Sequence, residues 1–138
     1  MRFIYVILAT LVLASLSAFH HPATGDDVPV LEEISQCLNS KDIDQLSQLF
    51  DQHVEITLSG KSKAYARAQA RQVIKTFMEQ YPPKEFAFAE QGTALHMLYA
   101  LGNYSSEKDH FEVDIYLKKR NPEGVYKIDQ MRIERKKK

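Results

Sequence analysis

The apolar residues of this chain change their spacing at Pro82-Pro83, and this change limits the folds that the chain can adopt. Before the prolines, apolar residues recur at helical spacing in three segments, with one alternating segment before the third. After the prolines, the apolar segments have the pattern of strands up to the end of the chain. A period of 3.6 predicts an amphipathic helix and a period of 2 predicts a half-buried strand. The sequence therefore predicts an α+β domain whose helices come mostly first and whose sheet comes mostly from the second half.

Three helices are predicted in the first half. We expect the first over residues 28–38, with Asp27 as its cap, and the second from residue 43 to Phe50. Asp42 caps the second helix, and Gln45 lies three residues further on, as in a capping box. The longest helix is predicted over residues 62–81, capped by Ser62 and ended by the two prolines. Its apolar stripe consists of Ala66, Ala70, Val73, Ile74, Phe77, Met78 and Tyr81.

Five strands are predicted, the first over residues 53–59 and ending at Gly60. The others follow the prolines, over residues 86–90, 94–104, 110–119 and 125–135. In the strand over 110–119 the inward positions are Phe111, Val113, Ile115 and Leu117. Asp114 falls on the opposite face of that strand. In the last strand the apolar residues change parity, which predicts a β-bulge near Asp129-Gln130.

Residues 1–18 have the pattern of a secretory signal peptide. Arg2 precedes an apolar run from Phe3 to Leu16, and small residues follow at positions 17 and 18. The run is shorter than the roughly 20 residues that span a bilayer, which disfavours a single-pass anchor. We therefore expect a periplasmic or secreted protein with a tether over 19–27, a domain over 28–135 and a basic tail over 136–138.

Composition narrows the possible partners. Lys and Arg total 18 and Asp and Glu total 18, so no net charge attracts nucleic acid, and no membrane anchor is expected after cleavage. Cys37 is the single cysteine, which excludes an intramolecular disulfide and predicts a buried apolar role. A cationic row at i+4 spacing on the long helix predicts a solvated face with ion pairs, or else an acidic partner. That row consists of Lys63, Arg67, Arg71 and Lys75.

The chain end Arg135-Lys136-Lys137-Lys138 predicts a solvated, frayed terminus; contact with anionic lipid or glycan is the alternative. The chain start offers a separate possibility. Cleavage after residue 17 or 18 would leave His20 or His21 at mature position three. A free amine, two backbone amides and that imidazole form a square-planar nitrogen site for Cu(II) or Ni(II).

The element order, the last strand VYKIDQMRIER and the strand segment LYALGNY together resemble the nuclear transport factor 2-like superfamily, which includes relatives of ketosteroid isomerase and polyketide cyclase. More narrowly, the chain is similar to small uncharacterised secreted bacterial families of that superfamily. The resemblance implies a nuclear transport factor 2-like, cystatin-like cone: three helices on a curved antiparallel sheet, with an apolar pocket at the open end. It also implies that the outer face of the sheet mediates homodimerisation.

Enzymes of this superfamily place an acid or base in the pocket. In the predicted strands over 53–59 and 110–119, where apolar and polar residues alternate clearly, the inward positions are all apolar. In the predicted strand over 94–104 both faces are largely apolar, so the sequence does not determine which set of alternate residues points inward. One parity makes His96 a candidate general base, and the other makes Tyr99 a hydrogen-bond donor. No GxSxG, HExxH or phosphate-binding glycine loop occurs, and no cofactor is predicted.

We therefore expect non-catalytic binding of a small apolar or amphipathic ligand or of a protein partner. The alternatives are an isomerase- or hydrolase-like enzyme with an acid or base in the pocket, and a structural homo-oligomer. The expected pocket lining is Phe50, Tyr65, Phe77, Phe88, Tyr99, Phe111 and Ile133.

Overall fold

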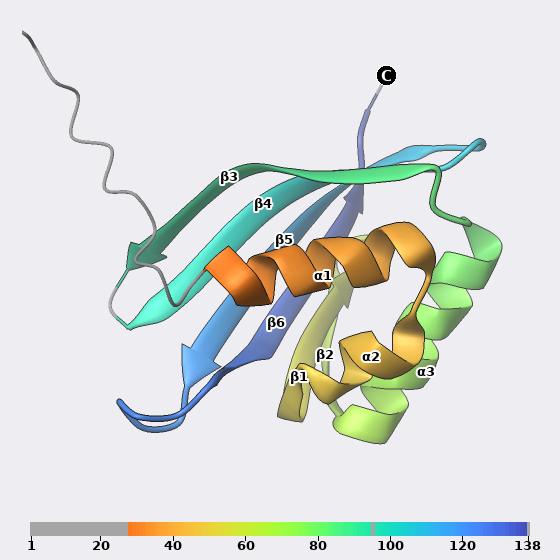
Figure 1. Cartoon of the computed structure of the whole chain (residues 1–138). Coiled ribbons are helices and arrows are strands. Elements are labelled where there is room, and N and C mark those ends of the chain that lie inside the picture. The colour runs from red at the N-terminus through yellow and green to blue at the C-terminus, as the bar shows by residue number, and fades with distance from the viewer. Residues whose placement is uncertain (1–27, 95, 138) are drawn as a thin grey trace, which may run out of the picture.

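Three helices pack against one six-stranded sheet in the computed structural model, which describes residues 28–94 and 96–137 (Figure 1). The helices are α1 (Val28–Ser40), α2 (Ile43–Gln48) and α3 (Arg67–Gln80). The strands are β1 (Phe50–Leu58), β2 (Lys61–Ala66), β3 (Glu85–Ala94), β4 (Met97–Ser105), β5 (His110–Lys119) and β6 (Tyr126–Arg135). The expected α+β architecture, with three helices on a curved sheet, is confirmed.

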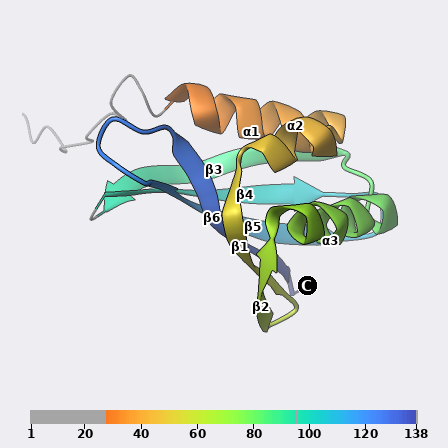
Figure 2. The same ribbon diagram turned by 90° about the horizontal axis from the view of Figure 1, so that it is seen from below.

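The strands lie in the order β2-β1-β6-β5-β4-β3. The meander from β3 to β6 is antiparallel as predicted, but β1 pairs with β6 in parallel, so the sheet is mixed. A long connection through α3 and the meander separates β1 from β6, so no hairpin forces the two strands to run in opposite directions. Figure 2 shows the twist of the sheet, from β3 and β4 to the steeply inclined β1 and β2.

The prediction that a helix begins at Ser62 is wrong, because residues 61–66 form β2. Ser59 and Gly60 have φ values of 52° and 78° and form a two-residue turn that pairs Leu58 with Lys61. A tight hairpin turn with positive φ at both positions matches the twist of paired strands. The helix α3 therefore begins only at Arg67, and its cap residue Ala66 makes no side-chain hydrogen bond. Phe50, expected at the end of the second helix, begins β1.

The meander has two distinct faces. On the core face, Leu98, Ala100, Gly102 and Tyr104 of β4 are buried, and they lie opposite buried residues of β5. The expected inward positions of β5 are all buried, and so are Ile128, Met131 and Ile133 of β6. The last three keep one face because Tyr116 pairs with Gln130 and Leu117 with Ile128, which leaves Asp129 as the predicted bulge.

The helices close the concave side of this sheet (Figure 1). The expected cap of α2 is confirmed, since Asp42 Oδ1 accepts a hydrogen bond from the Gln45 backbone N–H at 3.0 Å. The Gln45 side chain does not complete a capping box but donates to Glu33 on α1. Cys37 is buried on α1 as predicted, and burial, with the nearby carboxylates, raises the pKa of its thiol to about 11.

The edge strand β3 is protected by α1. The Asn39 amide donates to the Phe86 carbonyl at 2.9 Å, and its Oδ1 accepts from the Phe86 N–H at 2.8 Å. The side chain thus occupies the place of a neighbouring strand, which shields an otherwise open edge. None of the described helices has the length and apolar character needed to cross a bilayer.

Candidate functional site

A groove of about 500 Å³ runs beside α3, where the ends of β1, β5 and β6 meet it; we call it the α3 groove. Figure 2 shows α3, the β1–β2 turn and the C-terminal end of the chain on this side of the molecule. Its lining consists of Leu58, Ser59, Gln72, Val73, Thr76, Phe77, Gln80, Tyr81, Phe111, Ile133 and Arg135. Ligand pockets in proteins typically have volumes of roughly 300–1,000 Å³, so the space suits a small molecule.

Aromatic rings form the floor of the α3 groove at the C-terminal end of α3. The ring centroid of Phe111 lies 5.0 Å from that of Phe77 and 4.8 Å from that of Tyr81, both in edge-on contact. Beneath them, the buried hydroxyl of Tyr104 donates to the Tyr81 carbonyl at 2.5 Å, and burial raises the pKa of Tyr104. The Tyr104 hydrogen bond ties Tyr81, the C-cap residue of α3, to the buried face of β4.

Arg135 lies above this floor. It is the last residue of β6, pairs with Phe111 of β5, and has the same parity as the buried Ile133. Its Nη2 donates to the Tyr81 hydroxyl at 2.6 Å and lies 3.3 Å from Asp109 Oδ2. The guanidinium carbon is 5.7 Å from the centroids of both the Tyr81 and Phe111 rings, within the range of a cation–π contact. The side chain is still 55% exposed, so part of it faces solvent.

The α3 groove has a mostly apolar lining with one charged side chain among its described residues. Its described lining has one charged residue, Arg135, and includes no carboxylate, histidine or cysteine. Apolar side chains dominate the interior, and Gln72, Thr76 and Gln80 supply polar groups from exposed positions of α3. Such a surface can bury the apolar part of a ligand, and Arg135 can bind one polar or anionic group.

The structure brings together three of the seven predicted pocket residues: Phe77, Phe111 and Ile133 line the α3 groove. The other four lie elsewhere. Phe50 is fully buried in the core, Phe88 packs on Phe86 with the ring centroids 4.8 Å apart, and Tyr65 is on the edge strand β2. Tyr99 is on the outer face of the sheet, because the opposite parity of β4 faces the core.

The structure does not place His96 on the core face of a strand, as the general-base hypothesis required. His96 has the parity that faces the core, but it lies in the turn before β4 with φ +67°, and its side chain is exposed. It therefore lies outside the strand and does not line the α3 groove. His20 and His21 lie outside the described residues. In the described part of the chain, no three His, Cys, Asp or Glu side chains gather in a way that could hold a metal ion.

Asp114 lies on the outer face as predicted, but it is only 7% exposed. It lies between Leu101 of β4 and Arg132 of β6, whose Nη1 is 3.8 Å from Asp114 Oδ2. The other oxygen, Oδ1, has no hydrogen-bond partner among the described residues. Burial, together with the charge of Glu112, holds the pKa of Asp114 above its usual range, while Arg132 acts in the opposite direction.

The predicted cationic row on the long helix is broken. Lys63 belongs to β2, where its Nζ lies 5.3 Å from the centre of the Tyr65 ring. On α3, Arg71 pairs with Asp44 of α2 at 2.5 Å, which accords with the expectation of a face with ion pairs.

At the chain end, Arg135 is part of β6, and the Lys136 backbone N–H donates to the His110 carbonyl at 2.9 Å. Neither residue belongs to a frayed tail.

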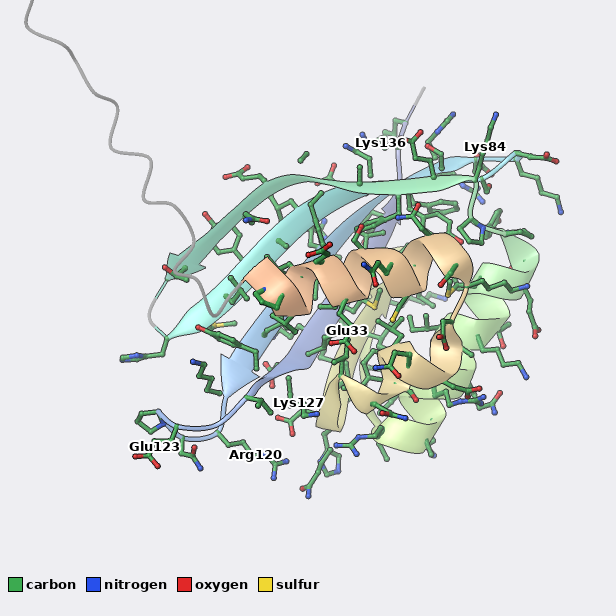
Figure 3. The ribbon with its side chains drawn as sticks, in the orientation of Figure 1. Glu33, Lys84, Arg120, Glu123, Lys127 and Lys136 are labelled. Atoms are coloured by element: carbon green, nitrogen blue, oxygen red, sulfur yellow. The ribbon has the colours of Figure 1, made fainter. Side chains whose placement is uncertain are left out.

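A second groove, of about 610 Å³, lies between the start of α1 and the β5–β6 turn; we call it the hairpin groove. Its lining is Pro29, Val30, Glu33, Leu49, Lys119, Pro122, Glu123, Gly124, Val125, Tyr126 and Lys127. Figure 3 shows Glu123 and Lys127 at the hairpin and Glu33 on α1. Four charged residues of both signs line it, whereas the described lining of the α3 groove has one charged residue. The α3 groove is therefore the stronger candidate.

Sequence reasoning missed Arg135 and Thr76 as groove residues. The signal for Arg135 was its parity, since the predicted bulge places it on the same face as Met131 and Ile133. Thr76 and Gln80 border the apolar stripe of α3, and such flanking positions gave no separate signal. Tyr81 was predicted as part of the stripe but not as a groove residue.

Comparisons with known proteins agree on the fold. A family model described as a domain of unknown function (DUF4783) matches residues 31–134. A DUF4783 family protein from Bacteroides ovatus is 19% identical with a TM-score of 0.74, covering 83% of this chain and 100% of that chain. The DUF4783 family protein from Bacteroides uniformis is 18% identical with a TM-score of 0.73, and the match covers 79% of this chain and 99% of that chain. A nuclear transport factor 2-like protein of unknown function from Shewanella baltica is 14% identical with a TM-score of 0.60, and the match covers 82% of this chain and 93% of that chain. Comparison with curated proteins gives no match.

Proposed function

We propose that this chain, which belongs to the DUF4783 family and folds as a nuclear transport factor 2-like domain, binds a small apolar or amphipathic molecule in the α3 groove. The observation that carries the proposal is the lining: a floor of packed aromatic rings with no carboxylate, histidine or cysteine among its described residues. Removing apolar ligand surface from water stabilises such a complex by about 25 cal/mol per Å².

The close packing of the floor supports the same proposal. Phe111 and Phe77 are buried and in edge-on contact, and the Tyr104 hydrogen bond holds Tyr81 beside them. A preformed floor does not have to be ordered when the ligand binds, which avoids about 0.5–1.5 kcal/mol of entropy cost for each side chain that is already fixed. Catalysis finds no comparable support, since His96 lies away from the α3 groove.

Fluorescence titration with the neutral apolar dye N-phenyl-1-naphthylamine tests the proposal. In one variant, Thr76→Trp, an indole on the exposed face of α3 fills the α3 groove. In the matched control, Val125→Trp, the same side chain enters the hairpin groove at a position that is 70% exposed. We expect Thr76→Trp to weaken dye binding about tenfold or more, and Val125→Trp to leave it unchanged.

The opposite pattern, with binding lost in Val125→Trp and kept in Thr76→Trp, would place the ligand in the hairpin groove and refute the proposal. Absence of dye binding by the unsubstituted protein would refute it as well. Circular dichroism of both variants checks that the fold is retained, since each substitution is at an exposed position.

Self-association through the outer face of the sheet is a second proposal, and Asp114 is the observation that favours it. A buried carboxylate oxygen without a partner is costly, and a second molecule on this face would offer it donors. Light scattering coupled to size exclusion tests this, with Leu101→Lys beside Asp114 and Glu123→Lys in the β5–β6 turn as control. We expect a dimer that Leu101→Lys alone dissociates; a monomeric unsubstituted protein refutes the proposal.

Export is proposed on the sequence alone, from the signal-peptide pattern of residues 1–18. Mass spectrometry of the protein recovered from the producing cell tests it. We expect the chain to begin at residue 18 or 19 and to be found outside the cytoplasm. An intact Met1 on protein retained in the cytoplasm would refute the proposal.

A further inference from the structure

Arg135 gives the α3 groove one charged end. It is the single charged residue of the described lining, and the buried Phe111 and half-buried Tyr81 lie beside it. A cation at the end of an apolar space selects ligands by charge as well as by shape, since an unpaired anion is costly to desolvate.

The hydrogen bonds of Arg135 leave part of its guanidinium group available for a ligand. Within the described residues they use Nη2 alone, which contacts the Tyr81 hydroxyl and lies near Asp109. The planar guanidinium has five N–H donors, and those on Nε and Nη1 make no hydrogen bond among the described residues, so each can donate a single hydrogen bond to a ligand carboxylate. Tyr81 and Phe111 support the guanidinium from beside it, each with its ring centroid 5.7 Å away, so this group is held in place before a ligand arrives.

The rest of the α3 groove sets the position of the apolar part. Its α3 side extends from Gln72 to Tyr81, a length of about 14 Å at 1.5 Å per residue. Leu58 and Val73 lie in this lining in addition to the aromatic floor, and none of the other described lining residues is charged. A ligand with its charged group at Arg135 can therefore lay an apolar chain along α3.

We propose that the ligand of the α3 groove is a small amphipathic carboxylate, whose anionic group binds the guanidinium of Arg135 and whose apolar part covers Phe77, Phe111 and Val73. This inference rests on the proposed function of the same groove and adds the chemical class of its ligand. The nearby Asp109 carboxylate opposes an incoming anion at Nη2, so we expect Nη1, the terminal nitrogen without a partner among the described residues, to make the contact.

Displacement of N-phenyl-1-naphthylamine by a matched ligand series tests the inference: dodecanoate, 1-dodecanol and dodecyltrimethylammonium, all below the concentrations at which micelles form. Arg135→Gln removes the charge, and Arg132→Gln is the control, because it removes the same charge from the opposite face of β6. We expect the unsubstituted protein to prefer dodecanoate to dodecanol about tenfold, which is about 1.4 kcal/mol. Arg135→Gln abolishes this preference, Arg135→Lys restores part of it, and Arg132→Gln leaves it intact.

The outcomes separate the two claims. If the dye and dodecanol bind but dodecanoate is not preferred, or if Arg132→Gln removes the preference as well, the carboxylate inference is refuted and the apolar groove stands. If the dye does not bind the unsubstituted protein at all, the proposed function itself fails. Retained dye binding by Arg135→Gln shows that the substitution left the aromatic floor in place.

Discussion

Two glycines of the β3–β4 pair are expected to respond differently to the same added methyl group. Gly102 of β4 lies under the buried Phe86, which is 3% exposed, and Gly92 of β3 lies under the half-buried Tyr99. A Cβ at Gly102 would come within 2.6 Å of two Phe86 ring atoms and 3.0 Å of the Ala87 carbonyl oxygen. A Cβ at Gly92 would come within 2.7 Å of the Tyr99 hydroxyl, the far end of a side chain on the outer face.

The difference in surroundings sets the magnitudes. Replacing Gly by Ala stabilises a protein by about 0.4–1 kcal/mol where the native backbone accepts it, by restricting the unfolded chain. At Gly102 the Phe86 ring and a backbone carbonyl must move within a close-packed core, which costs about 1–3 kcal/mol. We therefore expect Gly102→Ala to lower the free energy of unfolding by about 1–2 kcal/mol. Gly92→Ala moves only the Tyr99 side chain, so its net effect is close to zero.

Urea unfolding followed by circular dichroism measures both variants on the same sheet. Equal slopes of the free energy against urea concentration show that the two transitions expose similar surface, so that their midpoints can be compared. If Gly102→Ala proved as stable as Gly92→Ala, the close contact of Phe86 with β4 would not exist, and the packing described for this end of the sheet would be wrong.

Three further predictions follow from single side chains. Asn39→Ala, measured by urea unfolding, lowers the free energy of unfolding by about 1–2 kcal/mol, because two hydrogen bonds to the edge of β3 are lost; Gln36→Ala, on the exposed face of α1, has no effect. Burial and a neighbouring carboxylate raise the pKa of Asp114, so its contribution to stability is fully present below the unfolded-state pKa of about 4 and is lost as pH rises through the folded-state value. Thermal unfolding should therefore show Asp114→Asn to be more stable than the unsubstituted protein at pH 7, with the difference shrinking toward pH 4; a constant difference contradicts this. Asp109→Asn removes a carboxylate that competes for Arg135 and tightens dodecanoate binding about two- to fivefold in the dye displacement assay, whereas weaker binding would show that Asp109 orients the guanidinium.

The local patterns of the sequence predicted most of the fold. The bulge at Asp129 followed from a change of parity, and the α2 cap at Asp42 followed from its position before an apolar stripe. The segment over 61–66 was misassigned because its alanines suit a helix as well as an edge strand, and its spacing joined it to α3. Ser59-Gly60 carried the missing signal, since a Ser-Gly pair after an alternating segment predicts a hairpin turn.

The site was less predictable than the fold. Phe77 and Phe111 could be named from the sequence, because a buried aromatic residue on an inward position borders any pocket on that face. These rings lie beside Leu58 and Arg135 only because β1 pairs with β6 in parallel, which places the C-terminal ends of these two strands at the same end of the sheet. No local periodicity determines such a long-range pairing, so the composition of the α3 groove required the tertiary structure.

Amide chemical-shift mapping with dodecanoate locates the bound ligand on the molecule residue by residue. If the ligand binds in the α3 groove, saturable shifts concentrate on the C-terminal half of α3, on Phe111 and on Arg135, and they disappear in Thr76→Trp. Shifts concentrated on Val125 and the rest of the hairpin groove, or no saturable shifts at all, would contradict binding in the α3 groove.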